Sequence, residues 1–227
     1  MASENIKDWI EKNWRFVGSR VLEQGAKHYK DHSTLDLRAM FPKVERFVGM
    51  DLQDGGGVDV VCDLRSPFEE IDAAVQGKRF DTIFSISVME HVDDIFTAAR
   101  NTSRLLEEGG HLFISVPFVF RHHGYPSDYW RFTAEAVRFL FRDLDFESKE
   151  LAERAWISTL EAGDRTRLPA SFEKRNRFMH RPKETEARQE RKAMKLQNAE
   201  GQDVEVPGYS LAPTMINMIG RKRSESA

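Results

Sequence analysis

The stretch RFDTIFSISVMEHVDDIFTAARNTSRLLEEGGHLFISVPF, residues 79–118, decides the fold of this 227-residue chain. Its first part, Phe80 to Val88, is almost continuously apolar or small, which is typical of a strand buried on both faces of a parallel sheet. A helix capped by Asp93 or Asp94 is expected next, because apolar residues then recur at helical spacing. A second apolar strand, His111 to Phe118, completes a strand–helix–strand unit.

The same alternation extends in both directions from this unit. Further strands are predicted at Arg20–Glu23, Arg46–Met50 and Val58–Cys62, and helices at residues 4–16, 34–41, 66–77 and 134–142, with Ser66–Pro67 and Thr133 as caps of the last two. Two more strands, Phe146–Trp156 and Thr214–Arg221, have no helical pattern between them and can pair antiparallel at one edge.

This alternation predicts an α/β fold with right-handed crossovers. We expect one domain over residues 1–227, with a doubly wound, seven-stranded sheet between two helical layers, mostly parallel with an antiparallel edge strand. Residues 160–206 are polar and rich in Arg, Lys and Glu. They predict an insertion between the last two strands, partly helical from residue 183 to 198, that covers the site as a lid or packs on a second subunit. A homodimer is therefore left open.

Composition excludes several classes of protein. The formal net charge of −3 argues against nucleic acid as the partner, because phosphate binding needs a basic surface. No run of eighteen apolar residues is long enough to span a bilayer, and the first residues lack the pattern of a signal peptide. Cys62 is the single cysteine, so neither an internal disulfide nor a thiolate metal cage is expected. These features indicate a cytoplasmic protein.

Candidate ligand-binding residues follow the predicted strands. In an open parallel sheet, ligands bind beyond the carboxyl ends of the strands, near the point where the strand order reverses. Three of these ends carry an acid. The residues concerned are Glu23-Gln24-Gly25, Asp51-Leu52, Asp63-Leu64, Ser87 to His91, and the segment from Pro117 onward.

Five short motifs in fixed order share a family resemblance. They are Val21-Leu-Glu-x-Gly, Val48-Gly-x-Asp, Cys62-Asp-Leu, Val88-Met-Glu-His-Val-x-Asp, and Leu106-x-x-Gly-Gly-x-Leu-x-x-Ser-Val-Pro-Phe. Together they resemble the class I S-adenosylmethionine-dependent methyltransferases of the type 11 group, which have a Rossmann-like fold. The resemblance covers about Val21 to Leu144. The segment from His123 to Thr133 is similar to one that many bacterial members place after the fifth strand.

The resemblance implies a set of donor-binding positions for S-adenosyl-L-methionine. Glu23 and Gly25 would lie beneath the methionine part, Asp51 with Leu52 at the ribose hydroxyls, Asp63 and Leu64 at the adenine, and Ser87 with Glu90 beside the methyl group. Two of the acids have an alternative role, since Asp51 can cap a turn and Asp63 can pair with Arg65. The chain also has Ala26-Lys27-His28 where the family has further glycines, which separates it from nicotinamide-binding relatives.

The acceptor is expected beside the segment after the fifth strand. His123 is the candidate general base, with Asp128 holding its tautomer, and His91 is a second catalytic candidate. The other acceptor-binding candidates are His122, Tyr125, Asp128, Tyr129 and Arg131, the last of which can instead pair with Asp128. A metal site from His122, His123 and Asp128 fits no standard ligand spacing, so no metal is expected.

The resulting hypothesis is a methyltransferase for a small-molecule acceptor, with oxygen slightly favoured over nitrogen as the acceptor atom. The alternative is a protein that binds the donor but is catalytically silent and serves as a regulatory or assembly subunit. A nucleic-acid methyltransferase is disfavoured, because the chain lacks an Asn-Pro-Pro-Tyr-like motif and a basic charge.

Overall fold

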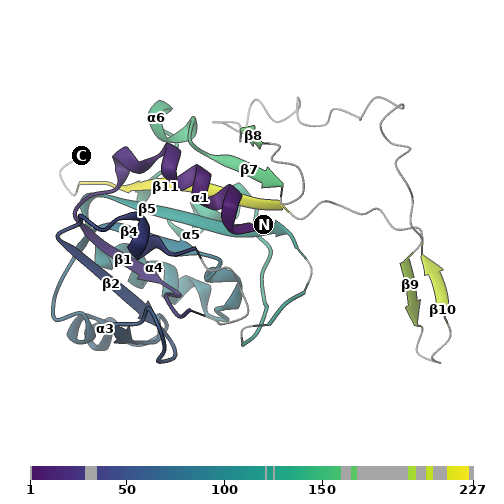
Figure 1. The fold of residues 1–227 in the computed structure, drawn as a ribbon, viewed down its shortest axis with the longest axis horizontal. Helices are drawn as coiled ribbons and strands as arrows, with labels where there is room; N and C mark the ends of the chain where they lie inside the picture. The colour runs from purple at the N-terminus through teal and green to yellow at the C-terminus, as the bar shows by residue number, and fades with distance from the viewer. Residues whose placement is uncertain are drawn as a thin grey trace.

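A single mixed sheet dominates the computed structural model, which describes residues 2–28, 35–120, 122–124, 126–159, 165–167, 194–197, 203–206 and 214–224. The strand order is β3-β2-β1-β4-β5-β11-β7-β8, and β6 also pairs with β11 (Figure 1). The strands are β1 (Arg20–Gln24), β2 (Arg46–Asp51), β3 (Val60–Val61), β4 (Phe80–Ile86), β5 (Leu106–Val119), β6 (Leu144–Asp145), β7 (Trp156–Thr159), β8 (Arg165–Arg167) and β11 (Thr214–Lys222).

The first five strands are parallel, as predicted. β1 pairs with β2 on one side and β4 on the other, with Glu23 opposite both Gly49 and Phe84. β3 extends the sheet beyond β2, and β5 lies beside β4. The order therefore reverses between β1 and β4, and the carboxyl ends of these strands meet at one edge of the sheet. This edge is where such folds bind ligands.

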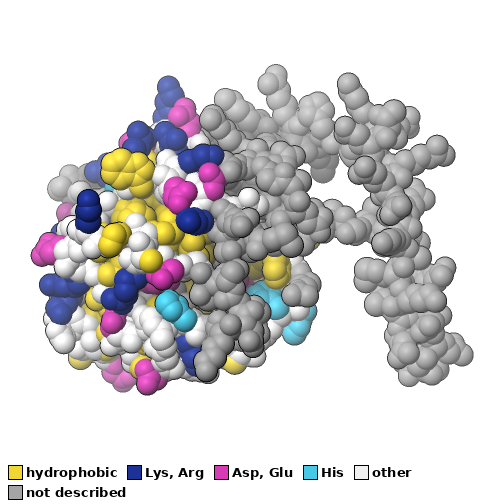
Figure 2. Space-filling view, viewed as in Figure 1, with side chains coloured by type: hydrophobic (Ala, Val, Ile, Leu, Met, Phe, Trp, Pro, Cys, Tyr) yellow, Lys and Arg dark blue, Asp and Glu magenta, His cyan; other side chains and the backbone are white. Residues whose placement is uncertain are grey.

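Helices cover both faces of the sheet. They are α1 (Ala2–Lys12), α2 (Leu37–Met40), α3 (Phe68–Ala74), α4 (Ile95–Leu105), α5 (Ala134–Leu140) and α6 (Lys149–Ala152), with short 3-10 turns η1 (Trp14–Phe16) and η2 (Met89–His91). Adjacent β4 residues serve opposite layers: Ile83 packs in the core with α3, α4 and α5, whereas Phe84 packs with α1 and α2. The predicted three-layer, Rossmann-like α/β architecture is confirmed. On the surface, charges of both signs are interspersed (Figure 2).

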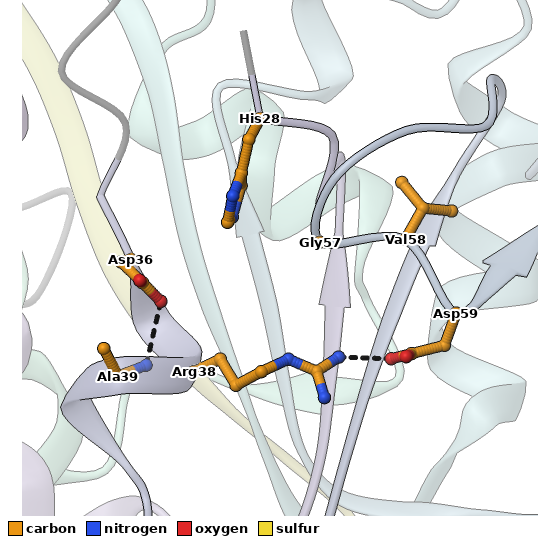
Figure 3. A pocket seen from close by; sticks show the side chains of 7 residues that line it. All are labelled: His28, Asp36, Arg38, Ala39, Gly57, Val58 and Asp59. Carbon is orange, nitrogen blue, oxygen red and sulfur yellow. Dashed lines mark hydrogen bonds and ion pairs between the residues drawn. The ribbon is translucent and has the colours of Figure 1, made fainter. Parts of the chain in front are cut away.

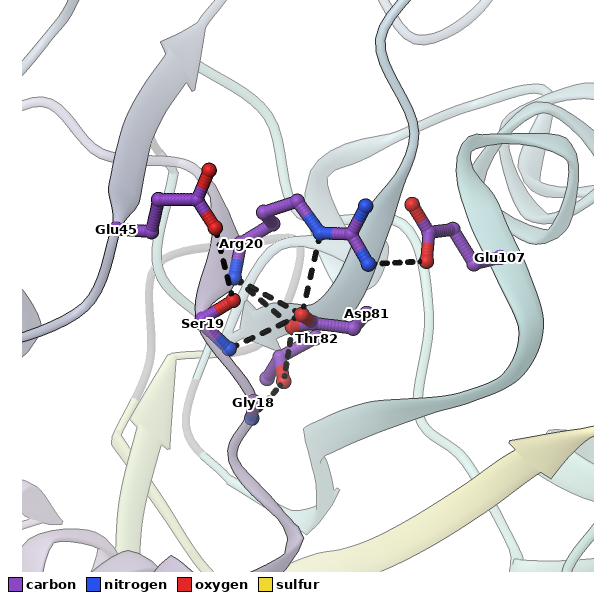
Figure 4. Close-up of polar contacts among 7 residues, drawn as sticks. All are labelled: Gly18, Ser19, Arg20, Glu45, Asp81, Thr82 and Glu107. Atoms are coloured by element: carbon purple, nitrogen blue, oxygen red, sulfur yellow. Dashed lines mark hydrogen bonds and ion pairs between the residues drawn. The ribbon is translucent and has the colours of Figure 1, made fainter.

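The amino ends of β1 and β4 are joined by one carboxylate (Figure 4). Asp81 accepts hydrogen bonds from the backbone N–H groups of Ser19 (3.0 Å) and Arg20 (3.0 Å to Oδ2). Arg20 also pairs with Glu107 at 2.6 Å. Gly18 passes so close that an added Cβ would lie 2.4 Å from the Asp81 carboxyl carbon. These contacts set the register at the end opposite the candidate site.

The carboxyl-terminal part differs from the prediction. The strand expected at Phe146–Trp156 is wrong, because β6 ends at Asp145, whose carboxylate accepts from the N–H groups of Glu147 (2.9 Å) and Ser148 (3.1 Å) and turns the chain into α6. The antiparallel strand expected at the edge is an interior one: β11 lies between β5 and β7. Its residues 215–220 are buried, which suits an interior position better than an edge.

Local signals were partly confirmed. Asp94 caps α4 through the N–H of Thr97, and Thr133 caps α5, whereas Ser66 does not cap α3, whose N-cap is Pro67 without a side-chain bond. Gly77, the residue expected at the end of this helix, lies just after α3 and has a positive φ of +67°.

Within the expected insertion, β9 (Met194–Gln197) and β10 (Asp203–Val206) form a separate antiparallel pair. The helix predicted for residues 183–198 is therefore wrong at 194–197, and its other residues lie outside the described part of the chain. The role of residues 160–206 as a lid or subunit contact stays a prediction. Among the residues that the structure describes, none of the helices has both the length and the apolar character needed to cross a membrane.

Candidate active site at the carboxyl ends of the strands

The turn after β1 has the tight geometry expected of a donor-binding loop. Gly25 has φ +72°, a conformation that side chains rarely adopt, and an added Cβ would lie 2.7 Å from Val88 Cγ2. Ala26 then donates its N–H to the Met50 carbonyl at 3.1 Å, which ties this turn to the end of β2. Glycine is therefore required at position 25 even though the usual run of glycines is missing.

Lys27 and His28 pack over the glycine loop, residues 55–57. Lys27 Nζ donates to Gln53 Oε1 at 2.7 Å, and its aliphatic stem contacts the position that a Cβ on Gly55 would occupy. The His28 ring lies against Gly57 in the same way. Both residues that replace family glycines are thus held by the neighbouring loop.

A surface pocket of about 420 Å³ adjoins this loop (Figure 3). It is lined by His28, Asp36, Arg38, Ala39, Gly57, Val58 and Asp59. Arg38 forms an ion pair with Asp59 across it, and Asp36 accepts the N–H of Ala39 at 2.8 Å. The pocket is lined by none of the predicted site residues, and its three charged side chains, Asp36, Arg38 and Asp59, are used in these structural contacts.

Asp51 combines a turn-capping role with free acceptor capacity. Its carboxylate accepts the backbone N–H groups of Lys27 (3.1 Å) and Gln53 (3.0 Å). A carboxylate has about four acceptor positions, so beside these contacts from the described residues two remain for a vicinal diol. Leu52 beside it is exposed. The ribose contact stays a prediction, but the turn cap is a fact of the fold.

Asp63 pairs with Arg65, the alternative to adenine binding that the sequence raised. Arg65 donates from its backbone N–H and from Nε at 2.9 Å and from Nη2 at 2.6 Å, and it also reaches Asp93 at 2.6 Å. The hydrogen bonds from Arg65 lower the pKa of Asp63. Leu64 is buried. The adenine contact of Asp63 stays a prediction, and it would have to share the carboxylate with Arg65.

Glu23 is a half-buried acid at the end of β1. Burial raises its pKa to about 8, although the positive charge of Arg38 opposes the shift. This carboxyl group therefore keeps its proton to a higher pH than an ordinary glutamate does.

The end of β4 carries backbone strain. Ser87 has φ 55°, which is unusual for a residue with a side chain, and its N–H donates to the Ser115 carbonyl at 2.8 Å. The turn redirects the chain into η2, which buries Glu90 at 1% exposure. Strain of this kind clusters at functional sites.

The acceptor-side segment, residues 122–124 and 126–132, is fastened to η2. Tyr129 donates its N–H to the Glu90 carbonyl at 2.8 Å, and His91 Nδ1 lies 2.5 Å from the Ser127 carbonyl oxygen. Trp130 Nε1 donates to the Val92 carbonyl at 2.8 Å. These contacts bring the segment onto the end of β4.

Asp128 organises this segment. Its carboxylate receives Arg131 Nη1 at 2.5 Å and Nη2 at 2.8 Å, together with the N–H of His123 at 2.7 Å. Nδ1 of His123 lies 3.2 Å from the same carboxylate. The hydrogen bonds from Arg131 hold the pKa of Asp128 well below its usual range. Arg131 is thus paired with Asp128, the alternative that the sequence raised.

Two of the remaining acceptor-binding candidates are described by the structure. His122 and Tyr129 are exposed, and Tyr125 falls outside the described residues.

The fold also creates a cluster that the sequence did not reveal. One ligand-type atom each from Glu90, His91 and His123 lies within 4.8 Å of the others. The two imidazole rings meet edge to face with centroids 5.0 Å apart. The adjacent Glu90–His91 pair was the available signal, but nothing in the sequence placed His123 beside it.

A doubly wound sheet with acids at consecutive strand ends defines a Rossmann-like, ligand-binding α/β protein. A family model described as "Methyltransferase domain" matches residues 2–155. The chain belongs to this methyltransferase-domain family, and its recognition as a class I S-adenosylmethionine-dependent methyltransferase is confirmed.

Curated relatives match a shorter region. Ubiquinone biosynthesis O-methyltransferases from strains of Xanthomonas oryzae pv. oryzae are 29% identical over 119 residues, which is 48% of this chain and 47% of theirs. The chain thus spans about half the length of these relatives.

Solved structures agree on the fold. A SAM-dependent methyltransferase from Archaeoglobus fulgidus has a TM-score of 0.53 at 12% identity, covering 97% of this chain and 94% of its own. The 1,6-didemethyltoxoflavin-N1-methyltransferase of Burkholderia thailandensis, solved with bound 1,6-didemethyltoxoflavin and S-adenosylhomocysteine, has a TM-score of 0.50 at 14% identity, covering 97% of this chain and 77% of its own.

Proposed function

We propose that this chain transfers a methyl group from S-adenosylmethionine to a small-molecule acceptor, with a hydroxyl oxygen favoured over nitrogen as the acceptor atom. The observation that carries the proposal is the convergence of His91 and His123 beside the end of β4. An oxygen acceptor must lose a proton during transfer, whereas an amine need not, and two imidazoles near the reacting centre suit that need.

For the donor side, we assign Glu23 and Gly25 to the methionine part, Asp51 and Leu52 to the ribose, and Asp63 and Leu64 to the adenine. The φ of Gly25 and the remaining acceptor capacity of Asp51 support the assignment. The bound donor supplies a methyl group activated by a sulfonium. Ser87 and Glu90, at the strained end of β4, line the methyl site in this proposal.

For the acceptor side, we assign His123 and His91 to deprotonation of the hydroxyl. Asp128 faces Nδ1 of His123, and Arg131 fixes Asp128, so the imidazole orientation is set before the acceptor arrives. His122, Tyr125 and Tyr129 would contact the acceptor. Holding acceptor and methyl in line supplies about 7–11 kcal/mol in favourable cases.

The alternatives are N-methylation and a silent donor-binding subunit. The relatives named as O-methyltransferases favour oxygen as the acceptor atom. The structural neighbour named as an N1-methyltransferase is the reason to retain nitrogen as the alternative acceptor atom. The acceptor-side histidines favour an enzyme over a silent subunit.

Turnover on a panel of phenols, catechols, alcohols and amines tests the proposal. We expect methylation of at least one hydroxyl compound, a loss of about 10²–10⁴-fold in His123→Gln, and donor affinity within about threefold of the parent protein. Methylation of amines alone, unaffected by His123→Gln, would contradict the oxygen assignment. Donor binding without turnover on any compound class would support the silent subunit instead.

A further inference from the structure

We propose that Glu90, His91 and His123 bind one divalent transition-metal ion on the acceptor side of the site. The role of that ion in presenting an acceptor oxygen rests on the proposed function, whereas its binding does not.

The first support is convergence. The candidate ligand atoms of the three residues all lie within 4.8 Å of one another, and His91 Nε2 is 3.9 Å from Glu90 Oε1. Ligands at about 2.0–2.2 Å from a tetrahedral ion lie about 3.3–3.5 Å apart. Small side-chain movements would therefore close the cluster around an ion.

The second support is the way the imidazoles are held from outside. His91 Nδ1 contacts the Ser127 carbonyl, which directs Nε2 toward Glu90. The Asp128 carboxylate faces Nδ1 of His123 and is itself held by Arg131. Metal-binding histidines characteristically use one ring nitrogen for such a carbonyl or carboxylate contact and the other for the metal.

The third support is the buried acid. Glu90 is 1% exposed, and within the described part of the chain its Oε2 has no hydrogen-bond partner. A buried polar atom of this kind needs an explanation, because burying a carboxylate without a partner is costly. A cation between Glu90 and the two imidazoles would supply the missing partner.

The chemistry of the donor set selects the ion. Two imidazole nitrogens and one carboxylate oxygen suit Zn²⁺, Co²⁺, Mn²⁺ or Fe²⁺ rather than Ca²⁺ or Mg²⁺, which prefer all-oxygen sites. Three protein ligands leave positions open for an outside molecule. The set differs from the one considered from sequence, since Asp128 is used by Arg131 and His122 is exposed.

An acceptor hydroxyl that binds at an open position becomes more acidic. With the ion bound, both imidazoles are ligands and act on this proton through the metal in place of their role as bases, so the hydroxyl loses its proton to solvent. The resulting oxygen electron pair then forms the bond to the methyl carbon. The carbon–sulfur bond breaks at the same time, and its electron pair stays on sulfur, which becomes a neutral thioether. The site therefore points to an acceptor whose hydroxyl can bind the metal ion. A second oxygen on the acceptor, next to this hydroxyl, would let the acceptor chelate the ion.

Cobalt titration of the full chain, stripped with a chelator, tests metal binding without donor or acceptor. We expect one equivalent of Co²⁺ with visible d–d bands. Asp128→Asn removes only a contact to a ligand and should weaken Co²⁺ binding by roughly 10–100-fold. His91→Gln and Glu90→Gln each remove a ligand and should weaken Co²⁺ binding by more than that. His122→Gln, adjacent to the cluster in sequence but exposed, should bind Co²⁺ like the parent protein.

Absence of stoichiometric Co²⁺ binding by the parent protein would overturn the proposal. Binding of Co²⁺ by His91→Gln with the affinity of the parent protein would overturn it too. His91→Gln keeps the buried Glu90 and so remains a valid test if Glu90→Gln fails to fold. Calorimetry with S-adenosylhomocysteine on the stripped protein separates the two proposals. Donor binding with no metal binding refutes the metal site alone, and metal binding with no donor binding refutes the proposed function alone.

Discussion

At Asp51, one carboxylate serves the loop and, in the proposed function, the ribose. Replacing it with alanine removes both sets of contacts. Hydrogen bonds to a charged group contribute about 1.5–3 kcal/mol, so Asp51→Ala should weaken binding of S-adenosylhomocysteine by roughly 10–100-fold. Calorimetry measures the affinity, and circular dichroism checks that the fold survives. A folded Asp51→Ala protein with the parent affinity would show that the acid only caps the turn.

Glu23 makes stability depend on pH in the ligand-free protein. Its pKa is raised from its usual 4.5 to about 8 by burial. The folded state therefore holds this proton where the unfolded chain has released it, and the free energy of unfolding falls as pH rises from about 4.5 to 8. Urea unfolding of the parent protein and Glu23→Gln at several pH values measures the difference. A difference that is constant across this window would contradict the raised pKa.

Some residue positions and contacts were predictable from the sequence and others were not. The strand-end acids and Gly25 stood out because they follow apolar strands directly. The engagement of Asp63 by Arg65 was visible as an alternative, since the two are neighbours in sequence. The meeting of His91 with His123 was not, because it depends on the hydrogen bond between Tyr129 and the Glu90 carbonyl, which no local pattern encodes.

At the scale of elements, Asp81 joins β1 to β4. Asp81→Ala leaves the N–H groups of Ser19 and Arg20 without their acceptor and Arg20 with fewer charge partners. We expect a loss of about 1–3 kcal/mol in the free energy of unfolding, with donor affinity unchanged because the contact lies at the opposite end of the sheet. Chemical denaturation and calorimetry check the two parts. A drop in donor affinity without a loss of stability would refute this separation.

Element prediction succeeded where burial produced a continuous or periodic apolar pattern. β4 and the helix that follows it are such cases, as are the caps Asp94 and Thr133, whose side-chain bonds are local. It failed after Asp145, where short elements are set by a turn and by packing against β11 rather than by periodicity. The interior position of β11 depends on long-range pairing, which the single strand pattern does not specify.

At the scale of the whole molecule, the sheet order brings residues from four strands to one edge. β3, β2, β1 and β4 lie side by side there, and η2 places Glu90 and His91 directly beyond β4. The fold class was therefore predictable from the order of the strands, and the position of the site at this edge stays a prediction. The arrangement of the acceptor-side segment was less predictable, because this segment is held by contacts with η2 and does not form a helix or strand.

Binding of S-adenosylhomocysteine to the purified full chain, followed by calorimetry and thermal unfolding, tests whether the strand-end residues hold a methyl donor. A donor site of this kind predicts saturable binding of one ligand per chain. It also predicts a stabilisation of about 2.7 kcal/mol when the ligand is present at about 100 times its dissociation constant. No heat of binding and no thermal shift at millimolar ligand would contradict the assignment of the strand-end residues to a methyl donor.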